Sequence, residues 1–128
     1  MIAEIIHKVP HRVEFFEIVG RLDHNHTSAL AGAVDTALHD GRNYLILDLS
    51  GVEYMNSAGL RVLVQVYKEV QRTSGALVVA NPSPQVMRLM NLVGLDSVLT
   101  IHQDPTWTAT QLSSSALPTA QRHTYYYL

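Results

Sequence analysis

The chain has 128 residues, of which 47% are hydrophobic and 16% charged, and its formal net charge is −2. This length suits one domain with a hydrophobic core, and the composition is that of a globular protein. The charges are spread along the sequence without a basic block, which argues against nucleic-acid binding. There are no cysteines, so disulfides, thiolate metal ligands and cysteine nucleophiles are excluded.

No segment reaches the roughly 18 consecutive apolar residues that a membrane-spanning helix needs. Residues 1–10 alternate polar and apolar side chains and lack the long apolar core of a signal peptide. We therefore expect a cytoplasmic protein without a membrane span.

Two strands joined by a hairpin are predicted in the first 20 residues. In residues 2–8, polar and apolar side chains alternate imperfectly, and residues 12–19 are rich in aromatic and β-branched side chains. Gly20 is expected to end the second strand. An exposed first strand could pair with a copy of itself, which would give a homodimer.

Three helices are predicted from apolar residues that recur at helical spacing. The first begins at a hydroxyl N-cap, either Thr27 or Ser28, and stops at Gly41. The second runs from near Ser57 to about residue 74. The third follows a proline-containing turn and ends at Gly94.

Strands alternate with these helices. Residues 44–49 and 76–80 are short apolar runs, typical of strands covered on both faces, and the first is expected to end at Ser50-Gly51. Residues 98–101 form a last strand, and a short helix is predicted at 106–112. The order ββαβαβαβα predicts a single α/β domain with a mostly parallel sheet and helices on at least one face.

The tail differs in composition from the rest of the chain. Residues 113–118 are linker-like, and residues 125–128 read Tyr-Tyr-Tyr-Leu. We expect a domain at residues 1–112 and a flexible extension at 113–128. The alternative is a segment that docks on its own domain or on a neighbour's edge.

Ser57 is the main candidate functional residue. It follows a loop after a buried strand and begins a helix, where free N–H groups favour negative charge. A phosphate there would add a charge of about −1.5 to −2, tolerated by its own domain but not by a partner packed over it. Ala58 and Gly59 are small and leave room for another backbone. The alternative is that Ser57 or Asn56 is an ordinary N-cap.

Five segments, in order, resemble a STAS domain, and in particular the bacterial anti-sigma factor antagonists. The likeness covers about residues 10–104 and is most specific between residues 47 and 60. It implies a sheet of mixed strand direction with helices mainly on one side. The segments are Gly-Arg-Leu-Asp at 20–23, Leu-Asp-Leu-Ser-Gly-Val at 47–52, Met-Asn-Ser-Ala-Gly-Leu at 55–60, Leu-Val-Val-Ala-Asn at 77–81 and Val-Gly-Leu at 93–95.

The resemblance implies a function by partner switching. In the antagonists, the serine at the position of Ser57 is phosphorylated by an anti-sigma factor that is also a serine kinase. The unphosphorylated form binds that kinase and frees a sigma factor, and a serine phosphatase of the metal-dependent type resets the switch. The chain itself is then not an enzyme and needs no cofactor.

A partner surface is predicted around the serine. It comprises Asp23, His24, Met55, Asn56, Ser57, Ala58, Gly59, Leu60 and Arg61. Two carboxylates keep alternative roles. Asp23 either faces the serine loop or bonds nearby backbone in its turn, and Asp48 either turns toward that loop or is a satisfied half-buried carboxylate.

The sequence departs from the family at Asn56, where the family usually has Asp. The change removes a negative charge beside the acceptor and keeps the capping oxygen, so it bears on kinase recognition more than on the binding surface. A STAS docking subunit of another assembly, such as a transport ATPase or a stress-signalling complex, would tolerate it. In that alternative, Ser57 serves for contact and is not phosphorylated.

Other functions find less support in the sequence. His24 and His26 lack a third metal ligand, so no metal site is expected. There is no glycine-rich phosphate loop and no Gly-x-Ser-x-Gly elbow around Ser57, which argues against a kinase and a serine hydrolase. A sensory domain that binds a small ligand is a further alternative.

Overall fold

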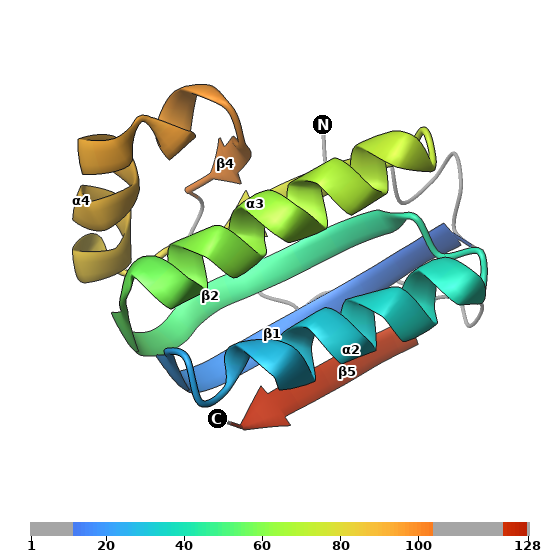
Figure 1. The fold of residues 1–128 in the computed structure, drawn as a ribbon, viewed down its shortest axis with the longest axis horizontal. Helices are drawn as coiled ribbons and strands as arrows, with labels where there is room; N and C mark the ends of the chain where they lie inside the picture. The colour runs from blue at the N-terminus through green and yellow to red at the C-terminus, as the bar shows by residue number, and fades with distance from the viewer. Residues whose placement is uncertain (1–11, 104–121, 128) are drawn as a thin grey trace.

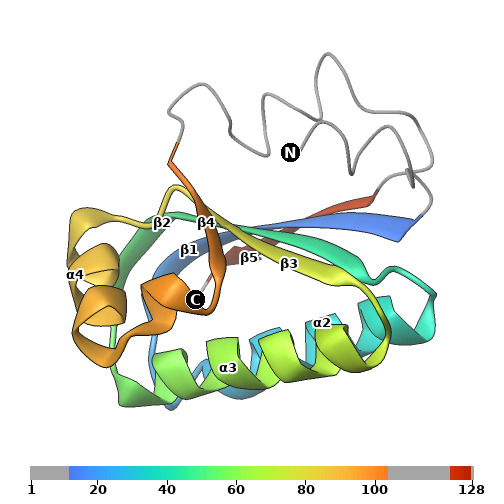
Figure 2. The ribbon, with the colours of Figure 1, turned by 90° about the horizontal axis from the view of Figure 1, so that it is seen from above.

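Five parallel strands form one sheet, and two long helices lie side by side on one of its faces (Figures 1 and 2). The structure is a computed structural model that describes residues 12–103 and 122–127. Its elements are β1 (Val13–Leu22), α2 (Thr27–His39), β2 (Tyr44–Met55), α3 (Ser57–Arg72), β3 (Ala76–Ala80), α4 (Pro84–Val93), the 3₁₀ helix η2 (Leu95–Ser97), β4 (Thr100–His102) and β5 (Arg122–Tyr127).

The strand order is β4-β3-β2-β1-β5, and all four pairings are parallel. The helices α2, α3 and α4 each connect two neighbouring strands, which confirms the predicted single α/β domain with helices mainly on one face. The strand predicted at residues 2–8, which would give the sheet its mixed direction, lies outside the described residues. The helix predicted at residues 106–112 also lies outside them.

β1 and β2 are longer than predicted, because glycines that were expected to end them sit at irregularities within them. β1 continues past Gly20 to Leu22, and β2 continues past Ser50-Gly51 to Met55. The register between the two strands shifts twice, and Gly20 has φ 114° beside the second shift. A bulge with a glycine of positive φ bends a strand without ending it.

The start of α2 also differs from the prediction. Its N-cap is His26, whose side chain makes no capping hydrogen bond, and neither Thr27 nor Ser28 caps the helix. Instead, the backbone N–H groups of His26 and Thr27 donate to the backbone oxygen of Asp23 at 3.0 and 3.1 Å. The loop therefore satisfies the first donors by folding back on itself.

Other boundaries agree more closely with the predictions. α3 begins at Ser57, β3 spans the predicted residues, and α4 ends before Gly94, which adopts the left-handed conformation. The last predicted strand is shifted. Residues Leu95–Ser97 form η2, and β4 follows at Thr100–His102.

Part of the tail adds a strand to the sheet. Residues Arg122–Tyr127 form β5, which pairs with β1 from Glu14 to Val19 along the edge opposite to β4. Docking on its own domain was the second alternative for this segment. The domain boundary near residue 112 stays a prediction, because residues 104–121 lie outside the described part of the chain.

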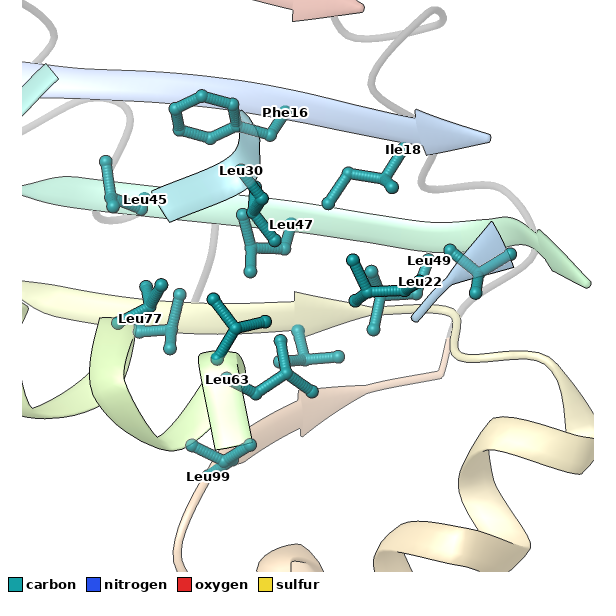
Figure 3. Packing of buried hydrophobic residues seen from close by; sticks show 14 of the residues in the cluster. Phe16, Ile18, Leu22, Leu30, Leu45, Leu47, Leu49, Leu63, Leu77 and Leu99 are labelled. Carbon is teal, nitrogen blue, oxygen red and sulfur yellow. The ribbon is translucent and has the colours of Figure 1, made fainter. Parts of the chain in front are cut away.

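The main core fills the space between the sheet and helices α2 and α3 (Figure 3). Phe16 and Leu47 from the sheet and Leu30 and Leu63 from the helices are all 0% exposed. Burying such side chains is the main favourable contribution to folding. The core therefore fixes α2 and α3 against the strands whose ends carry the candidate site.

Replacing Leu63 tests this packing. We expect Leu63→Ala to lower the free energy of unfolding by about 2–5 kcal/mol, because it leaves a cavity between α3 and the sheet. Leu92→Ala is the matched control, since Leu92 on α4 is 82% exposed, and its effect should stay within about 0.5 kcal/mol. Urea denaturation followed by circular dichroism measures both. Equal losses in the two variants would contradict the assigned core.

Candidate functional site

Ser57 is the first residue of α3 and is exposed at the end of β2. The preceding residue, Asn56, is the N-cap, and its Oδ1 accepts hydrogen bonds from the N–H groups of Ala58 and Gly59 at 3.0 and 3.3 Å. Of the two capping alternatives, the structure therefore selects Asn56. The hydroxyl of Ser57 is left facing solvent at the positive end of the helix.

Gly59 allows the first turn of α3 to approach the end of β1. A Cβ at Gly59 would lie 2.5 Å from the backbone oxygen of Leu22 and 2.6 Å from Cγ of Met55. The room beside this glycine is therefore filled by the protein's own chain. Only glycine fits such a contact. The contact at Gly59 therefore fixes the position of Ser57 at the start of α3.

The predicted partner residues divide by burial. His24, Ser57 and Arg61 are exposed, and Asn56 and Ala58 are partly exposed. The other predicted contact residues are buried, so they support the surface from beneath. These residues are Asp23, Met55, Gly59 and Leu60.

Asp23 organises the loop between β1 and α2. Its Oδ1 accepts from the N–H of Asn25 at 3.1 Å and lies 2.8 Å from Nδ1 of His26, and its Oδ2 lies 3.7 Å from Nε of Arg21. Arg21 in turn stacks over the ring of Tyr54, 4.2 Å from its centroid. These contacts describe a turn carboxylate, one of the two alternatives for this residue.

The pKa of Asp23 reflects these contacts. Burial acts to raise the pKa of this carboxyl. The hydrogen bonds from Asn25 and His26, and the positive charge on His26 and His24 when they are protonated, outweigh burial and hold the pKa below its ordinary value of 3.8. Asp23 is therefore an anion at neutral pH.

The sheet register brings the two loops together. Leu22 at the end of β1 pairs with Met55 at the end of β2, so the loop that follows each strand emerges at the same edge of the sheet. Asp48 has a different position. It is 1% exposed within β2, and its Oδ1 accepts from the N–H of Ser50 at 3.0 Å. Its hydrogen bond thus supports the irregular part of β2.

Two hollows flank the exposed end of α3. The α2–α3 hollow, of about 280 Å³, is lined by residues that include His24, Thr27, Ser28, Ala58, Arg61 and Gln65. The Ser57 hollow, of about 260 Å³, is lined by Ser57, Leu60, Arg61, Val64, Val93 and Leu95. No carboxylate lines either hollow, and Arg61 lines both.

Sequence reasoning missed the contribution of α2 to this surface. Thr27, Ser28 and Gln65 line the α2–α3 hollow, and none of them was predicted to contact a partner. Gln65 follows Arg61 by four residues, so the helical period of α3 would have placed both on one face. The approach of α2 toward that face depends on the tertiary fold.

Within residues 12–103 and 122–127 there is neither a cluster of metal ligands nor a helix suited to a membrane. Among them, no group of three His, Cys, Asp or Glu side chains could hold a metal ion. None of the helices described is both long and apolar enough to cross a membrane. The ring of His26 contacts Asp23, as described above, and His24 is exposed.

The chain resembles known proteins over most of its length. The family model of the STAS domain matches residues 4–106. The anti-sigma F factor antagonist of Paenibacillus polymyxa is 28% identical over 94 residues, which are 73% of this chain and 80% of that protein. The anti-sigma-F factor antagonist RsfB of Mycobacterium tuberculosis is 32% identical over 84 residues, 66% of this chain and 68% of that protein.

A solved structure agrees with these sequence matches. An anti-sigma factor antagonist from Mycobacterium paratuberculosis has a TM-score of 0.59 to this chain at 27% sequence identity. The match covers 76% of this chain and 82% of that one.

Adding a methyl group at Gly59 tests the contact between α3 and β1. We expect Gly59→Ala to destabilise the fold by about 1–3 kcal/mol, because the methyl group meets the backbone of Leu22. Gly32→Ala on α2 is the matched control, since nothing lies within 4 Å of a Cβ there. It should raise stability by about 0.5–1 kcal/mol. Thermal unfolding of both variants measures the difference, and a neutral Gly59→Ala would contradict the contact.

The lowered pKa of Asp23 predicts a pH-dependent contribution to stability. A carboxyl with a lower pKa in the folded state stabilises the fold above its unfolded pKa and loses that effect as the pH falls through the folded pKa. The stability difference between wild type and Asp23→Asn should therefore shrink as the pH falls below about 4. Denaturation at a series of pH values measures it. A carboxyl titration of Asp23 by NMR with a midpoint at or above 3.8 would contradict the assignment.

Proposed function

Because the chain belongs to the STAS family, we propose that it is an anti-sigma factor antagonist that acts by partner switching. The unphosphorylated protein binds an anti-sigma factor that is also a serine kinase, and a sigma factor is released. Phosphorylation of Ser57 by that kinase abolishes binding, and a serine phosphatase of the metal-dependent type restores it. The relatives named as antagonists support this role.

The position of Ser57 carries the proposal. Its side chain is exposed at the N-terminus of α3, while Asn56 performs the capping that a serine there could otherwise perform. A kinase can therefore approach the hydroxyl, and its modification costs the helix no capping hydrogen bond. The helix end also favours the negative charge that phosphorylation adds.

The same phosphate would oppose a partner packed on this surface. A group with a charge of about −1.5 to −2 keeps its hydration shell in solvent and loses it in an interface. The cost falls on the complex and spares the free protein, so one modification separates the partners while the fold persists. This difference between the two states is what partner switching requires.

Asn56 has two consequences for this cycle. Its neutral amide caps α3 and, unlike a carboxylate, does not repel a phosphate on the next residue. It also removes a charge that a kinase could recognise beside the serine. The second consequence favours the alternative function, a docking subunit of another assembly in which Ser57 makes contact without being phosphorylated.

Phosphorylation and binding can be measured together. The protein is incubated with ATP and each candidate anti-sigma factor kinase from its source genome, and intact mass and peptide mapping locate any phosphate. We expect one phosphate on Ser57 and none on Ser57→Ala. Ser97→Ala, which removes another exposed serine, is the control and should be phosphorylated like the wild type.

Binding to the same anti-sigma factor is then measured by calorimetry. Ser57→Ala should bind within a few-fold of the wild type, and the phosphorylated protein should bind at least about 10-fold more weakly, or ~1.4 kcal/mol. Binding without phosphorylation would replace the proposal with the docking alternative. An absence of binding to every candidate would overturn the antagonist function.

A further inference from the structure

Arg61 separates the two hollows at the exposed end of α3. It lines the α2–α3 hollow on one side and the Ser57 hollow on the other. It is the only formally charged residue at neutral pH that lines either of them. An arginine at this boundary can reach a ligand in either direction, because its side chain is long and mobile.

Arg61 also lacks a partner within the described part of the chain, where no hydrogen bond or ion pair involves it. Arg21 and Arg72, by contrast, have partners. Arg21 contacts Asp23 and the ring of Tyr54, and Arg72 donates to Glu69 at 2.9 Å. The charge of Arg61 is therefore available to an external anion.

The spacing between Ser57 and Arg61 is four residues on one helix. Residues at this spacing lie on the same face, one turn apart, where side chains of opposite charge attract each other. Ser57 and Arg61 also line one hollow together. A phosphate on Ser57 would thus lie beside the guanidinium group, which binds phosphate oxygens in a bidentate manner.

We propose that Arg61 has two alternative anionic ligands, a carboxylate of the anti-sigma factor and the phosphate of Ser57. In the unmodified protein, Arg61 binds an aspartate or glutamate side chain of the partner that enters the α2–α3 hollow. After phosphorylation, it turns to the phosphate in the Ser57 hollow. This inference rests on the proposed function and names the chemistry of the partner at that site.

The lining of the α2–α3 hollow fits an acidic side chain. Thr27 and Ser28 supply hydroxyl groups, Gln65 supplies an amide, and no carboxylate repels an incoming anion. Ala58 is small and sits beside Arg61 in the lining. A carboxylate there can therefore pair with the guanidinium group and accept hydrogen bonds from its neutral neighbours.

Phosphorylation then weakens binding in two ways. The phosphate repels the partner's carboxylate, and it also occupies the arginine that this carboxylate needs. If repulsion alone weakens binding, phosphorylation should reduce the affinity by the same factor with or without Arg61. If the phosphate also captures Arg61, phosphorylation should reduce the affinity by a smaller factor once Arg61 is removed.

The contact with phosphate can be tested without a kinase. Phosphoserine is placed at position 57 by genetic encoding, and the second pKa of the phosphate is measured by phosphorus NMR. We expect a lower pKa when Arg61 is present than in Arg61→Gln, because the guanidinium group favours the dianion. Arg88→Gln is the control, since Arg88 on α4 lines another hollow. Identical titrations with and without Arg61 would overturn the capture step.

The contact with the partner is tested on the unmodified protein. Arg61→Gln should bind the anti-sigma factor at least about 10-fold more weakly and with a weaker dependence on salt, because a charge-assisted contact is lost. Arg61→Lys should recover part of the affinity, and Arg88→Gln should bind like the wild type. Unchanged thermal unfolding of the variants shows that exposed Arg61 does not support the fold.

These outcomes separate the two proposals. In one outcome the wild type binds the anti-sigma factor and is phosphorylated, but Arg61→Gln has the same affinity and the same ratio of affinities between its unmodified and phosphorylated forms. The role of Arg61 is then overturned and the proposed function stands. If the wild type binds no anti-sigma factor, the proposed function fails, and the partner contact of Arg61 fails with it. If phosphorylation reduces the affinity of Arg61→Gln by a smaller factor than it reduces the affinity of the wild type, the capture step is supported.

Discussion

The close contact between the first turn of α3 and the end of β1 determines the geometry of the candidate site. Gly59 has no space for a Cβ beside the backbone oxygen of Leu22, so the helix and strand approach each other as closely as their backbones permit. Asp23 directly follows Leu22 and begins the loop after β1, and Ser57 lies two residues before Gly59. This contact, packed against the side chains of Leu22 and Met55, therefore positions both loops.

Helix capping and the proposed phosphorylation fall on neighbouring residues at this site. The N-terminus of a helix needs an acceptor for its free N–H groups, and Asn56 provides it with a neutral amide. The proposed phosphate on Ser57 would then add charge without removing a cap, and Arg61 lies one turn farther along the same helix. Under the proposed function, phosphorylation would change the surface at Ser57 and leave both the helix cap and the core around Leu63 unchanged.

The sequence predicted most of the local structure and the STAS family, which the family model confirms. The start of α3 was predictable because the N-cap and the helical period agree there. The lengths of β1 and β2 were not, because Gly20 and Gly51 look alike in sequence whether they end a strand or form a bulge within it. The hollow between α2 and α3 depends on how two distant helices pack, which local patterns do not determine.

The edges of the sheet also affect how copies of the protein meet. At one edge of the sheet, β4 presents only three residues. On the other side β1, which is longer than β4, is covered because β5 pairs with it. An uncovered long strand is a template for aggregation, whereas a short edge offers few backbone groups to a foreign chain. Once β5 has paired with β1, the edge on that side is the six-residue β5 in place of the ten-residue β1, so the sheet offers a shorter row of backbone groups to another chain than β1 alone would.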